Sequence, residues 1–403
     1  MNTRSKSKLT TCLLAFSIIG ISALHAQAPD PEQYRQRSLQ WSEQRNTQGL
    51  AEPFKGVTTD GSVEQGLFEI RSTGISTASI ATAANDFLAT LNNDQQQRIS
   101  FGIDDEEWRK WANQHIYYRD GISFDEMSPI QREAAQAMLG ESLSARGLTL
   151  SNDIMHLNTT LGELNGDNFV EYGEGKYWIT IMGTPSATEP WGWQLDGHHL
   201  NLNYFVLGDQ VVMTPAFWGS EPAVAESGEY AGTAIMEDEQ RYGLAMVNTL
   251  NESQRAQAIL ETSKTGNNIM TQAFSDNVVL DSAGIKVSEL TAAQKQQLMR
   301  LIGIYVGNMR EGHQGVRMAE IEAHLDDTWF AWVGETTDDA VFYYRIQSPV
   351  VLIEFDHETP VGLRHMYPRG VPYKEHIHAV VRTPNGNDYG KDILRQHYLA
   401  HPH

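Results

Sequence analysis

Cysteine is almost absent from this chain. The one cysteine among 403 residues is Cys12, and it lies in an N-terminal segment that we expect to be removed. A mature chain without cysteine has no disulfide bonds and no thiolate metal ligands. This excludes disulfide-stabilised scaffolds and cysteine-rich zinc modules, so a metal site in this protein would have to use histidine and carboxylate side chains.

Long apolar segments are absent beyond the N-terminus. Residues 1–26 comprise a basic start, an apolar run over 9–24 and small residues before an expected cleavage site after Ala26. This is the pattern of a secretory signal peptide. No later uncharged apolar run reaches about 18 residues, so we expect no membrane span. The sequence therefore predicts export, either to a periplasm or out of the cell.

Positive charge is also scarce. The chain has 30 Lys and Arg residues against 51 Asp and Glu residues. Because the three charges of the signal peptide are all basic, the mature chain would have 27 basic and 51 acidic residues, a formal charge of −24. Such a surface repels nucleic acids and anionic membranes. We therefore expect a small-molecule substrate and no nucleic-acid partner, and the sequence leaves the oligomeric state open.

Several common catalytic motifs are missing. The sequence has no Gly-x-Ser-x-Gly elbow, no His-Glu-x-x-His zinc helix and no phosphate-binding loop. The best-known hydrolase and nucleotide-binding classes therefore have no motif to support them here.

Four copies of one local pattern mark the starts of helices. Each has Asn, Ser or Thr followed three residues later by Gln, as a capping box requires. The four pairs are Asn92 and Gln95, Ser128 and Gln131, Asn251 and Gln254, and Thr291 and Gln294. We predict helices that begin near these positions in a single large domain over 65–400. Residues 27–64 show no regular pattern and would form a lead-in to that domain.

Two segments of the chain resemble each other. YWITIMG at 177–183 is similar to TWFAWVG at 328–334, and each is followed by a run rich in aromatic and β-branched residues, which favour strands. Aligning the glycines that end them predicts that a unit of two helices and three strands occurs twice, over about 90–270 and 271–400. The alternative is a chance similarity. In either case we predict an α+β fold, with helices packed against one or two mostly antiparallel sheets.

The final predicted strand has two histidines on one face. His376, His378 and Arg382 alternate onto one side, while the residues between them are apolar and belong in the core. Two histidines spaced in this way can present two nitrogens to one metal ion. The same spacing also occurs on structural or solvent-exposed strand faces.

A second pair, His198 and His199, stands at the head of another alternating run. Neighbouring strand residues point to opposite faces, so at most one of the pair faces the same side as Asn201 and Asn203. His199 continues into these asparagines, a polar row that needs hydrogen-bonding partners. His198 continues into an apolar row, where a core histidine bonded to the backbone is an alternative to a metal ligand.

Glu354 lies in a run apolar enough to be a central strand. A carboxylate there is costly to bury unless it is paired or bound to a cation. With the histidines, it would complete a ligand set of the kind that binds copper, iron or zinc. Whether the strands that carry these residues are neighbours does not follow from the sequence. The alignment of the two similar segments also makes Glu354 the counterpart of Asn203.

Three segments carry a resemblance to a known family. They are Gly197-His198-His199, then Phe217, Gly219 and Pro222, and finally His376, His378 and Arg382 followed by Asn387-Asp388-Tyr389-Gly390. In this order and spacing they resemble the bacterial domain-of-unknown-function family numbered 3500, over roughly 65–400. An acidic residue usually follows the arginine in that family, where this chain has Thr383. The resemblance implies that the histidine motifs act together, and it implies no reaction.

The sequence therefore favours an exported metal-dependent enzyme with one transition-metal ion. His198, His199, His376 and His378 are the candidate ligands. Glu354 would be a further ligand or a proton acceptor, and Arg382 would orient an anionic or carbonyl substrate.

The identity of the metal would decide the reaction. Copper or iron suits oxidation, and the lack of thiolates in an oxidising compartment favours this oxidoreductase hypothesis. Zinc at the same residues would suit hydrolysis. Two further alternatives are a binding protein for a metal or small ligand, and histidines that only satisfy buried hydrogen bonds.

Overall fold

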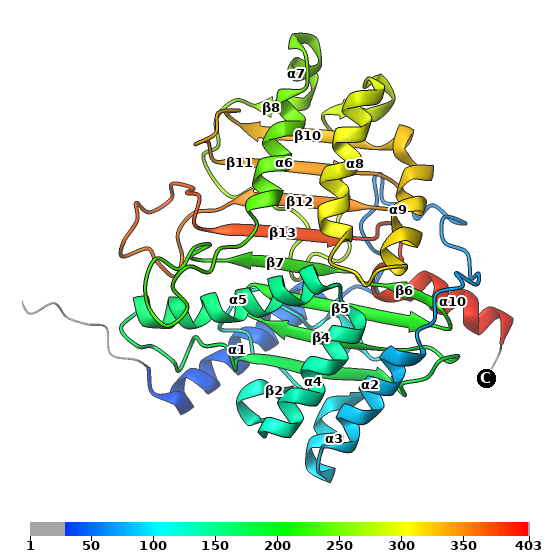
Figure 1. Cartoon of the computed structure of the whole chain (residues 1–403), viewed down its shortest axis with the longest axis vertical. Helices are drawn as coiled ribbons and strands as arrows, with labels where there is room; N and C mark the ends of the chain where they lie inside the picture. The colour runs from blue at the N-terminus through cyan, green and yellow to red at the C-terminus, as the bar shows by residue number, and fades with distance from the viewer. Residues whose placement is uncertain (1–28, 402–403) are drawn as a thin grey trace, which may run out of the picture.

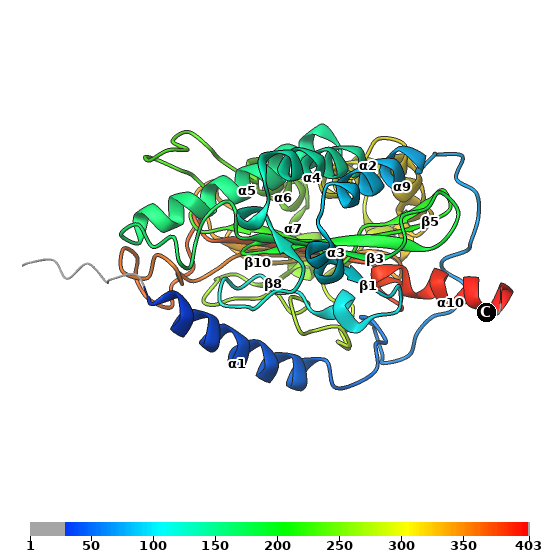
Figure 2. The ribbon, with the colours of Figure 1, turned by 90° about the horizontal axis from the view of Figure 1, so that it is seen from below.

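The structure is a computed structural model and describes residues 29–401. One large sheet runs through the molecule. Six helices cover one of its faces, and a long N-terminal helix, a C-terminal helix and several loops cover the other (Figures 1 and 2). This is the α+β fold predicted from the sequence. The expected signal peptide, residues 1–26, lies outside the described residues.

The sheet has 13 strands and is mostly antiparallel. In spatial order its body consists of β3 (Tyr177–Gly183), β4 (Trp191–Gly197), β5 (Leu200–Leu207), β7 (Ala216–Ser220), β13 (Ile377–Arg382), β12 (Leu352–His357), β11 (Phe342–Gln347) and β10 (Trp329–Gly334). The shorter strands are β1 (Ser100–Phe101), β2 (Ile122–Ser123), β6 (Gln210–Val212), β8 (Ile259–Glu261) and β9 (Ile285–Lys286). Among the described strands, only β1 with β3 and β8 with β10 pair in parallel.

The six helices on one face form two sets of three. They are α2 (Ala78–Ala89), α4 (Pro129–Ser142) and α5 (Ala145–Leu164), then α6 (Glu237–Asn248), α8 (Ala292–Val306) and α9 (His313–Ala323). The short helices α3 (Asn93–Ile99) and α7 (Glu252–Ala258) lie at opposite ends of the sheet, and α1 (Pro31–Gly49) and α10 (Lys391–Ala400) cover the second face (Figures 1 and 2). Short 3₁₀ helices span Glu106–Arg109, Phe124–Glu126, Val287–Glu289, Leu325–Asp327 and Asp388–Gly390. Within residues 29–401, none of the helices has both the length and the apolar character needed to cross a membrane.

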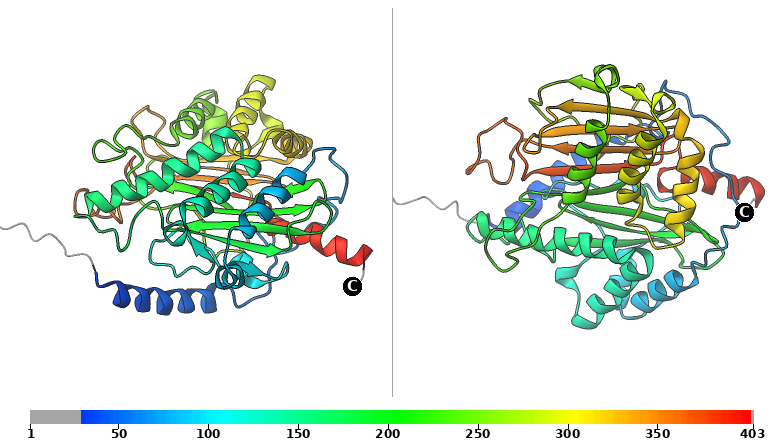
Figure 3. Two further views of the ribbon diagram at one scale, coloured as in Figure 1. Left: turned by 60° about the horizontal axis from the view of Figure 1, so that its bottom comes forward. Right: turned by 45° about the horizontal axis from the view of Figure 1, so that its top comes forward.

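The order of elements recurs in the two halves of the sheet. The series α2, α3, β1, β2, α4, α5, β3, β4, β5, β7 is repeated as α6, α7, β8, β9, α8, α9, β10, β11, β12, β13, with β6 as an extra strand in the first half. β7 and β13 pair antiparallel in the middle, so the halves lie side by side with their helices on the same face (Figure 3). The second series begins at Glu237. This corrects the division near residue 271 expected from the sequence, because α6, α7 and β8 also belong to the second half.

All four expected capping boxes are present, at the N-termini of α3, α4, α7 and α8. The capping glutamines also contact each other within each half. Gln131 Nε2 lies 2.9 Å from Gln95 Oε1, and Gln294 Nε2 lies 2.8 Å from Gln254 Oε1. The same local contact therefore joins equivalent helices in both halves.

The two glycines aligned in the sequence end equivalent strands. Gly183 ends β3 with a φ of 74°, and Gly334 ends β10 with a φ of 116°, a region that glycine enters without steric cost. Gly183 pairs with Trp191 on the next strand, and Gly334 pairs with Phe342, as the alignment requires. The similarity of the two segments is thus a feature of the fold.

The main apolar core lies between the sheet and the six helices. Trp193 stacks on Tyr204 with ring centroids 5.1 Å apart, and Tyr344 stacks on Phe355 at 5.0 Å. Burying a large apolar side chain contributes about 1.5–3 kcal/mol relative to leaving it exposed. This face therefore fixes which side of each strand points toward the helices.

The opposite face of the sheet is polar and equally buried. Its polar residues include Gln194, Asn203, Glu354, Asp356 and Arg382, each at most 2% exposed. The segments 103–121 and 263–284 cover this face and supply hydrogen-bonding partners, such as the backbone N–H of Met270 for Glu354. These segments thus supply the partners that buried polar groups such as Gln194, Glu354 and Arg382 require.

Helix α1 corrects the expectation of an unpatterned lead-in over 27–64. Asp30 caps its N-terminus by accepting a hydrogen bond from a backbone N–H of the first turn, at 3.0 Å. The helix packs through Trp41, whose ring meets that of Tyr117 edge-on with centroids 6.3 Å apart. The helix is otherwise mostly polar, so it shows no apolar periodicity that would predict it.

Candidate metal centre

The two histidine motifs meet at one end of the polar face. His198 and His199 form the two-residue turn between β4 and β5, whereas the sequence suggested that they begin a strand. β7 pairs with both β5 and β13, which places this turn beside the start of β13. His376 directly precedes β13 and His378 is its second residue. Strand order therefore brings together residues that lie 177 positions apart in the sequence.

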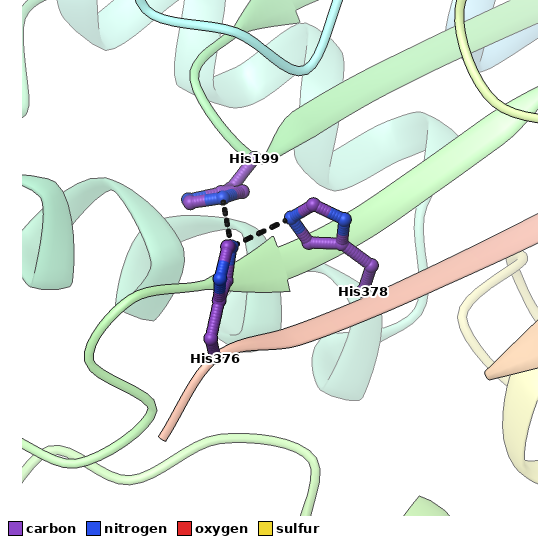
Figure 4. A group of neighbouring side chains, drawn as sticks. All are labelled: His199, His376 and His378. Carbon is purple, nitrogen blue, oxygen red and sulfur yellow. Dashed lines mark hydrogen bonds between the residues drawn. The ribbon is translucent and has the colours of Figure 1, made fainter. Parts of the chain in front are cut away.

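His199 has an unusual backbone conformation. Its φ is 62°, in the left-handed region that non-glycine residues enter at a cost of about 1–3 kcal/mol. Its N–H donates to the carbonyl of Asn113 at 3.1 Å, which holds the turn against the 103–121 segment. The ring of His199 lies over the start of β13 (Figure 4). A strained residue held in this way is consistent with a functional demand on its side chain.

Three histidine nitrogens converge. His376 Nε2 lies 3.3 Å from His199 Nε2 and 3.0 Å from His378 Nε2 (Figure 4). One nitrogen from each of the three rings lies within 4.8 Å of the others. The three residues are only 2–6% exposed. Two nitrogens that each lie about 2.05 Å from a tetrahedral ion are about 3.3 Å apart, so these separations suit one shared metal ion.

The surroundings fix which ring nitrogen carries the proton. His376 Nδ1 lies 2.7 Å from the carbonyl oxygen of Thr359, and His378 Nδ1 lies 3.0 Å from Glu358 Oε1. The carbonyl only accepts hydrogen bonds, so His376 donates from Nδ1 and its Nε2 has a lone pair. His378 Nδ1 and the Glu358 carboxylate are an ion-pair contact without hydrogen-bond alignment, and the negative charge favours a proton on that Nδ1. Carboxylates and carbonyls orient metal-binding histidines in this same way.

With the protons of both rings on Nδ1, two lone pairs face each other across 3.0 Å, an arrangement that a cation between them would stabilise. An extra proton would also serve, but burial lowers the pKa of His376, and burial together with the neighbouring histidines lowers that of His199 well below its usual value. Neutral imidazoles are the form that binds metal ions. These pKa directions favour the neutral form of His376 and His199, which leaves their ring nitrogens able to bind a metal ion.

His198 is not part of this three-histidine group. Its ring stacks on that of His199 with centroids 3.9 Å apart, but its Nδ1 lies 2.8 Å from Oδ1 of Asn158. Asn158 donates its own amide N–H to the carbonyl of Gly173 at 2.9 Å, so its oxygen accepts from His198. Of the four expected histidine ligands, the structure therefore brings together three.

Glu354 lies on the same face of the sheet but outside the group. It pairs in register with Val380, two residues along β13 from His378, which is about 7 Å at the usual strand rise. Its carboxylate accepts from the backbone N–H of Met270 at 3.1 Å and from the hydroxyl of Tyr343 at 2.7 Å. These contacts tie Glu354 to the 263–284 segment and answer the need for a partner noted in the sequence.

Arg382 is also fully engaged with the protein. It is four residues from His378 along β13, about 13 Å. It forms ion pairs of 3.1 Å with both Asp276 and Asp388, and its Nε donates to the carbonyl of Thr271 at 2.7 Å. Burial opposes its charge, but the two carboxylates more than offset this and raise its pKa. The guanidinium is therefore already occupied where the sequence suggested a substrate.

Sequence reasoning missed Glu358 and Thr359 beside the ligands, and it left Glu221 open between the mouth of a pocket and a turn. Glu358 and Thr359 follow β12 directly, in the loop that returns to His376. Glu221 lies 3.9 Å from His376 Nδ1 and accepts a hydrogen bond from the backbone N–H of Gly362 at 2.6 Å, which anchors the same loop. The sequence gives one clue to each acid, namely its position at the end of a strand. Glu221 directly follows β7, and Glu358 directly follows β12, which pairs with β13.

The comparisons with known proteins give a family and no activity. Residues 73–391 match the family described as "Protein of unknown function (DUF3500)", so the chain belongs to this family. No curated protein and no solved structure matches the chain. The family agrees with the resemblance found in the sequence.

Proposed function

We propose that this protein is an exported, metal-dependent enzyme whose single transition-metal ion is held by His199, His376 and His378. The observation that carries the proposal is the convergence of three ring nitrogens, with His376 Nε2 3.0 Å from His378 Nε2 and 3.3 Å from His199 Nε2, in a site where His376 Nδ1 is already committed as a donor. Three neutral nitrogen ligands suit copper, iron or zinc. They leave at least one coordination position for a substrate or water, as catalytic sites require.

The bound ion would supply one of two chemistries. Copper or iron would supply electron transfer for an oxidation, and zinc would supply Lewis acidity for a hydrolysis. The oxidoreductase hypothesis draws its support from the absence of thiolates in a chain that we expect to be exported. The contact between Glu358 and His378 supports the hydrolase alternative, because carboxylate–histidine pairs are characteristic of zinc sites.

The chain's own residues have defined tasks in either case. The Thr359 carbonyl holds the proton of His376 on Nδ1, and the negative charge of Glu358 beside His378 Nδ1 favours a proton there, so that both Nε2 atoms are available. Glu354 and Arg382 act as positioning residues, since their polar atoms hold the 263–284 segment over the sheet. In this proposal neither one is a ligand or a contact of the substrate.

Metal analysis of untagged protein, purified from its native compartment, tests the proposal. We expect about one ion of copper, iron or zinc per chain. The variant His376→Ala/His378→Ala should contain none, because one nitrogen ligand does not hold an ion in this site. The variant His324→Ala/His365→Ala removes two histidines outside the site and should retain the ion.

Wild-type protein that stays metal-free after incubation with all three metals would overturn the proposal. Metal that persists in the His376→Ala/His378→Ala variant would also overturn it, because the ion would then be bound elsewhere. The identity of the ion separates oxidation from hydrolysis. A bound ion without turnover of any substrate would favour the remaining alternative, a binding protein.

A further inference from the structure

A cavity lies directly behind the metal centre, on the far side of His198. It has a volume of about 290 Å³, near the lower end for small-molecule sites (roughly 300–1,000 Å³). Its walls come from α1, from the last turn of α3, from residues 115–119, from α5 and its following loop, and from β3 with the residue before it. The metal ligands His199, His376 and His378 are not among its lining residues.

Aromatic rings form much of the cavity wall. The lining includes Tyr34, His115, Tyr117, Tyr118, Trp178 and His198. The hydroxyl of Tyr34 donates to the carbonyl of His115 at 2.9 Å, which ties α1 to the opposite wall. Rings arranged around a small cavity favour a flat ligand, because faces and edges of rings attract one another.

The charged residues that line the cavity are mostly cationic. Arg35, Arg98, Arg119 and Lys176 face it together with one acid, Glu171. This is the reverse of the whole chain, which has 51 acidic and 30 basic residues. A positive, partly enclosed site in a negative protein concentrates anions at one place.

The carboxylate partners of these cations lie outside the lining. Arg98 pairs with Glu126 at 2.7 Å and Lys176 pairs with Asp125 at 3.5 Å, and neither acid lines the cavity. The side chains of both acids are more than a third exposed, and exposed ion pairs of this kind contribute little stability. Arg98 and Lys176 can therefore also pair with an anionic ligand at small cost.

His198 offers the ligand an acceptor. Its Nδ1 donates to Asn158, so its Nε2 carries a lone pair, and none of the described residues forms a hydrogen bond with that atom. The same ring stacks on the metal ligand His199, so the cavity is one ring away from the proposed ion.

We propose that this cavity binds a small molecule with a planar ring and a carboxylate. The ring packs among the aromatic side chains, the carboxylate pairs with Arg98 and Lys176, and His198 Nε2 accepts a hydrogen bond from the ligand. Calling this ligand the substrate rests on the proposed function, whereas the binding itself does not.

Benzoate is the simplest probe of this chemistry, and benzamide is its neutral counterpart. Calorimetric titration of the full mature chain should give saturable benzoate binding with a Kd about tenfold lower than that of benzamide, because charge-assisted hydrogen bonds are the stronger kind. The variant Arg98→Gln/Lys176→Gln should bind benzoate about tenfold more weakly and benzamide unchanged. The variant Arg241→Gln/Arg300→Gln removes two exposed arginines from α6 and α8, which do not line the cavity, and should behave as wild type.

Absence of saturable benzoate binding would overturn the inference, as would equal affinity for benzamide or an unchanged Kd in Arg98→Gln/Lys176→Gln.

The His376→Ala/His378→Ala variant separates this inference from the proposed function. It should bind benzoate as wild type does, since the cavity and the ligand triad share no residue. Benzoate binding in a protein that never takes up metal would retain the cavity and reject the metal centre. Metal uptake without benzoate binding would retain the metal centre and reject the cavity as a binding site.

Discussion

The two halves of the sheet share one order of elements but carry different residues at equivalent positions. The turn between β4 and β5 holds His198 and His199, whereas the turn between β11 and β12 runs over 348–351 and has no histidine. Conversely, His376 and His378 lie at the start of β13 in the second half, whereas the equivalent strand of the first half, β7, has no histidine. The candidate metal centre therefore lies where the halves meet, with a turn from one half and a strand from the other.

The polar face shows a second difference between the halves. Gln194 pairs in register with Asn203 in the first half, and Arg345 pairs with Glu354 at the equivalent position in the second. In the first half the two neutral amides form a hydrogen bond, in which Gln194 Nε2 donates to Asn203 Oδ1 at 2.8 Å. Glu354 is instead satisfied by the covering segment. The comparison teaches that a repeated backbone accepts either solution, provided that every buried polar group finds a partner.

The largest effect on stability should come from Arg382, whose counterpart in the other half is Phe217. Arg382→Leu leaves the carboxylate of Asp388 buried without its cation, which should lower the free energy of unfolding by about 3–5 kcal/mol. Phe217→Leu puts the same residue at the equivalent position and should cost about 1 kcal/mol, because it only changes apolar packing. Urea unfolding of the metal-free proteins measures both, and equal costs would mean that the ion pairs of Arg382 are not structural.

Glu354 and Asn203 occupy equivalent positions in the two halves. A charge can therefore be removed at one position and introduced at the other. Glu354→Gln should lower the free energy of unfolding by about 1.5–3 kcal/mol, because it weakens charge-assisted hydrogen bonds to the 263–284 segment. Asn203→Asp should also destabilise, since its amide now donates to the carbonyl of Pro215 at 2.9 Å. Both variants should keep their metal. If Glu354→Gln lost its metal and Asn203→Asp kept it, the hypothesis that Glu354 is a ligand would be supported.

The smallest effect concerns the strained turn. His199→Gly should raise the stability of the metal-free protein by about 1 kcal/mol, because glycine adopts a φ of 62° without strain. The same change should abolish stoichiometric metal binding. His198→Gly, at the neighbouring turn position, should lower stability instead, and thermal unfolding in the presence of a chelator compares the two. A loss of stability in His199→Gly would mean that its ring contributes more through packing than its backbone costs.

Local features of the fold were predictable from the sequence. The capping boxes depend on residues three positions apart, and the alternation in β13 depends on neighbours, so both follow from short-range rules. The glycines at the ends of β3 and β10 made the repeat visible. Helix α1 and the early start of the second half were not predictable in this way, because α1 is mostly polar and the equivalent helices share little beyond their caps.

The site depends on long-range pairing, which the sequence does not contain. His199 meets His376 only because β7 lies between β5 and β13, an order that no local pattern specifies. The prediction of Glu354 as a ligand was based on the cost of an unpaired buried charge, and that cost is met by Met270 and Tyr343. The rule that a buried carboxylate needs a partner was sound, but it could not say which partner.

The most direct test of the central claim is anomalous diffraction from crystals of the untagged, metal-loaded protein. The account predicts one strong peak about 2.0–2.1 Å from Nε2 of each of His199, His376 and His378. A metal-loaded crystal without a peak there, or with its peak at Glu354 or at the C-terminal histidines, would contradict it.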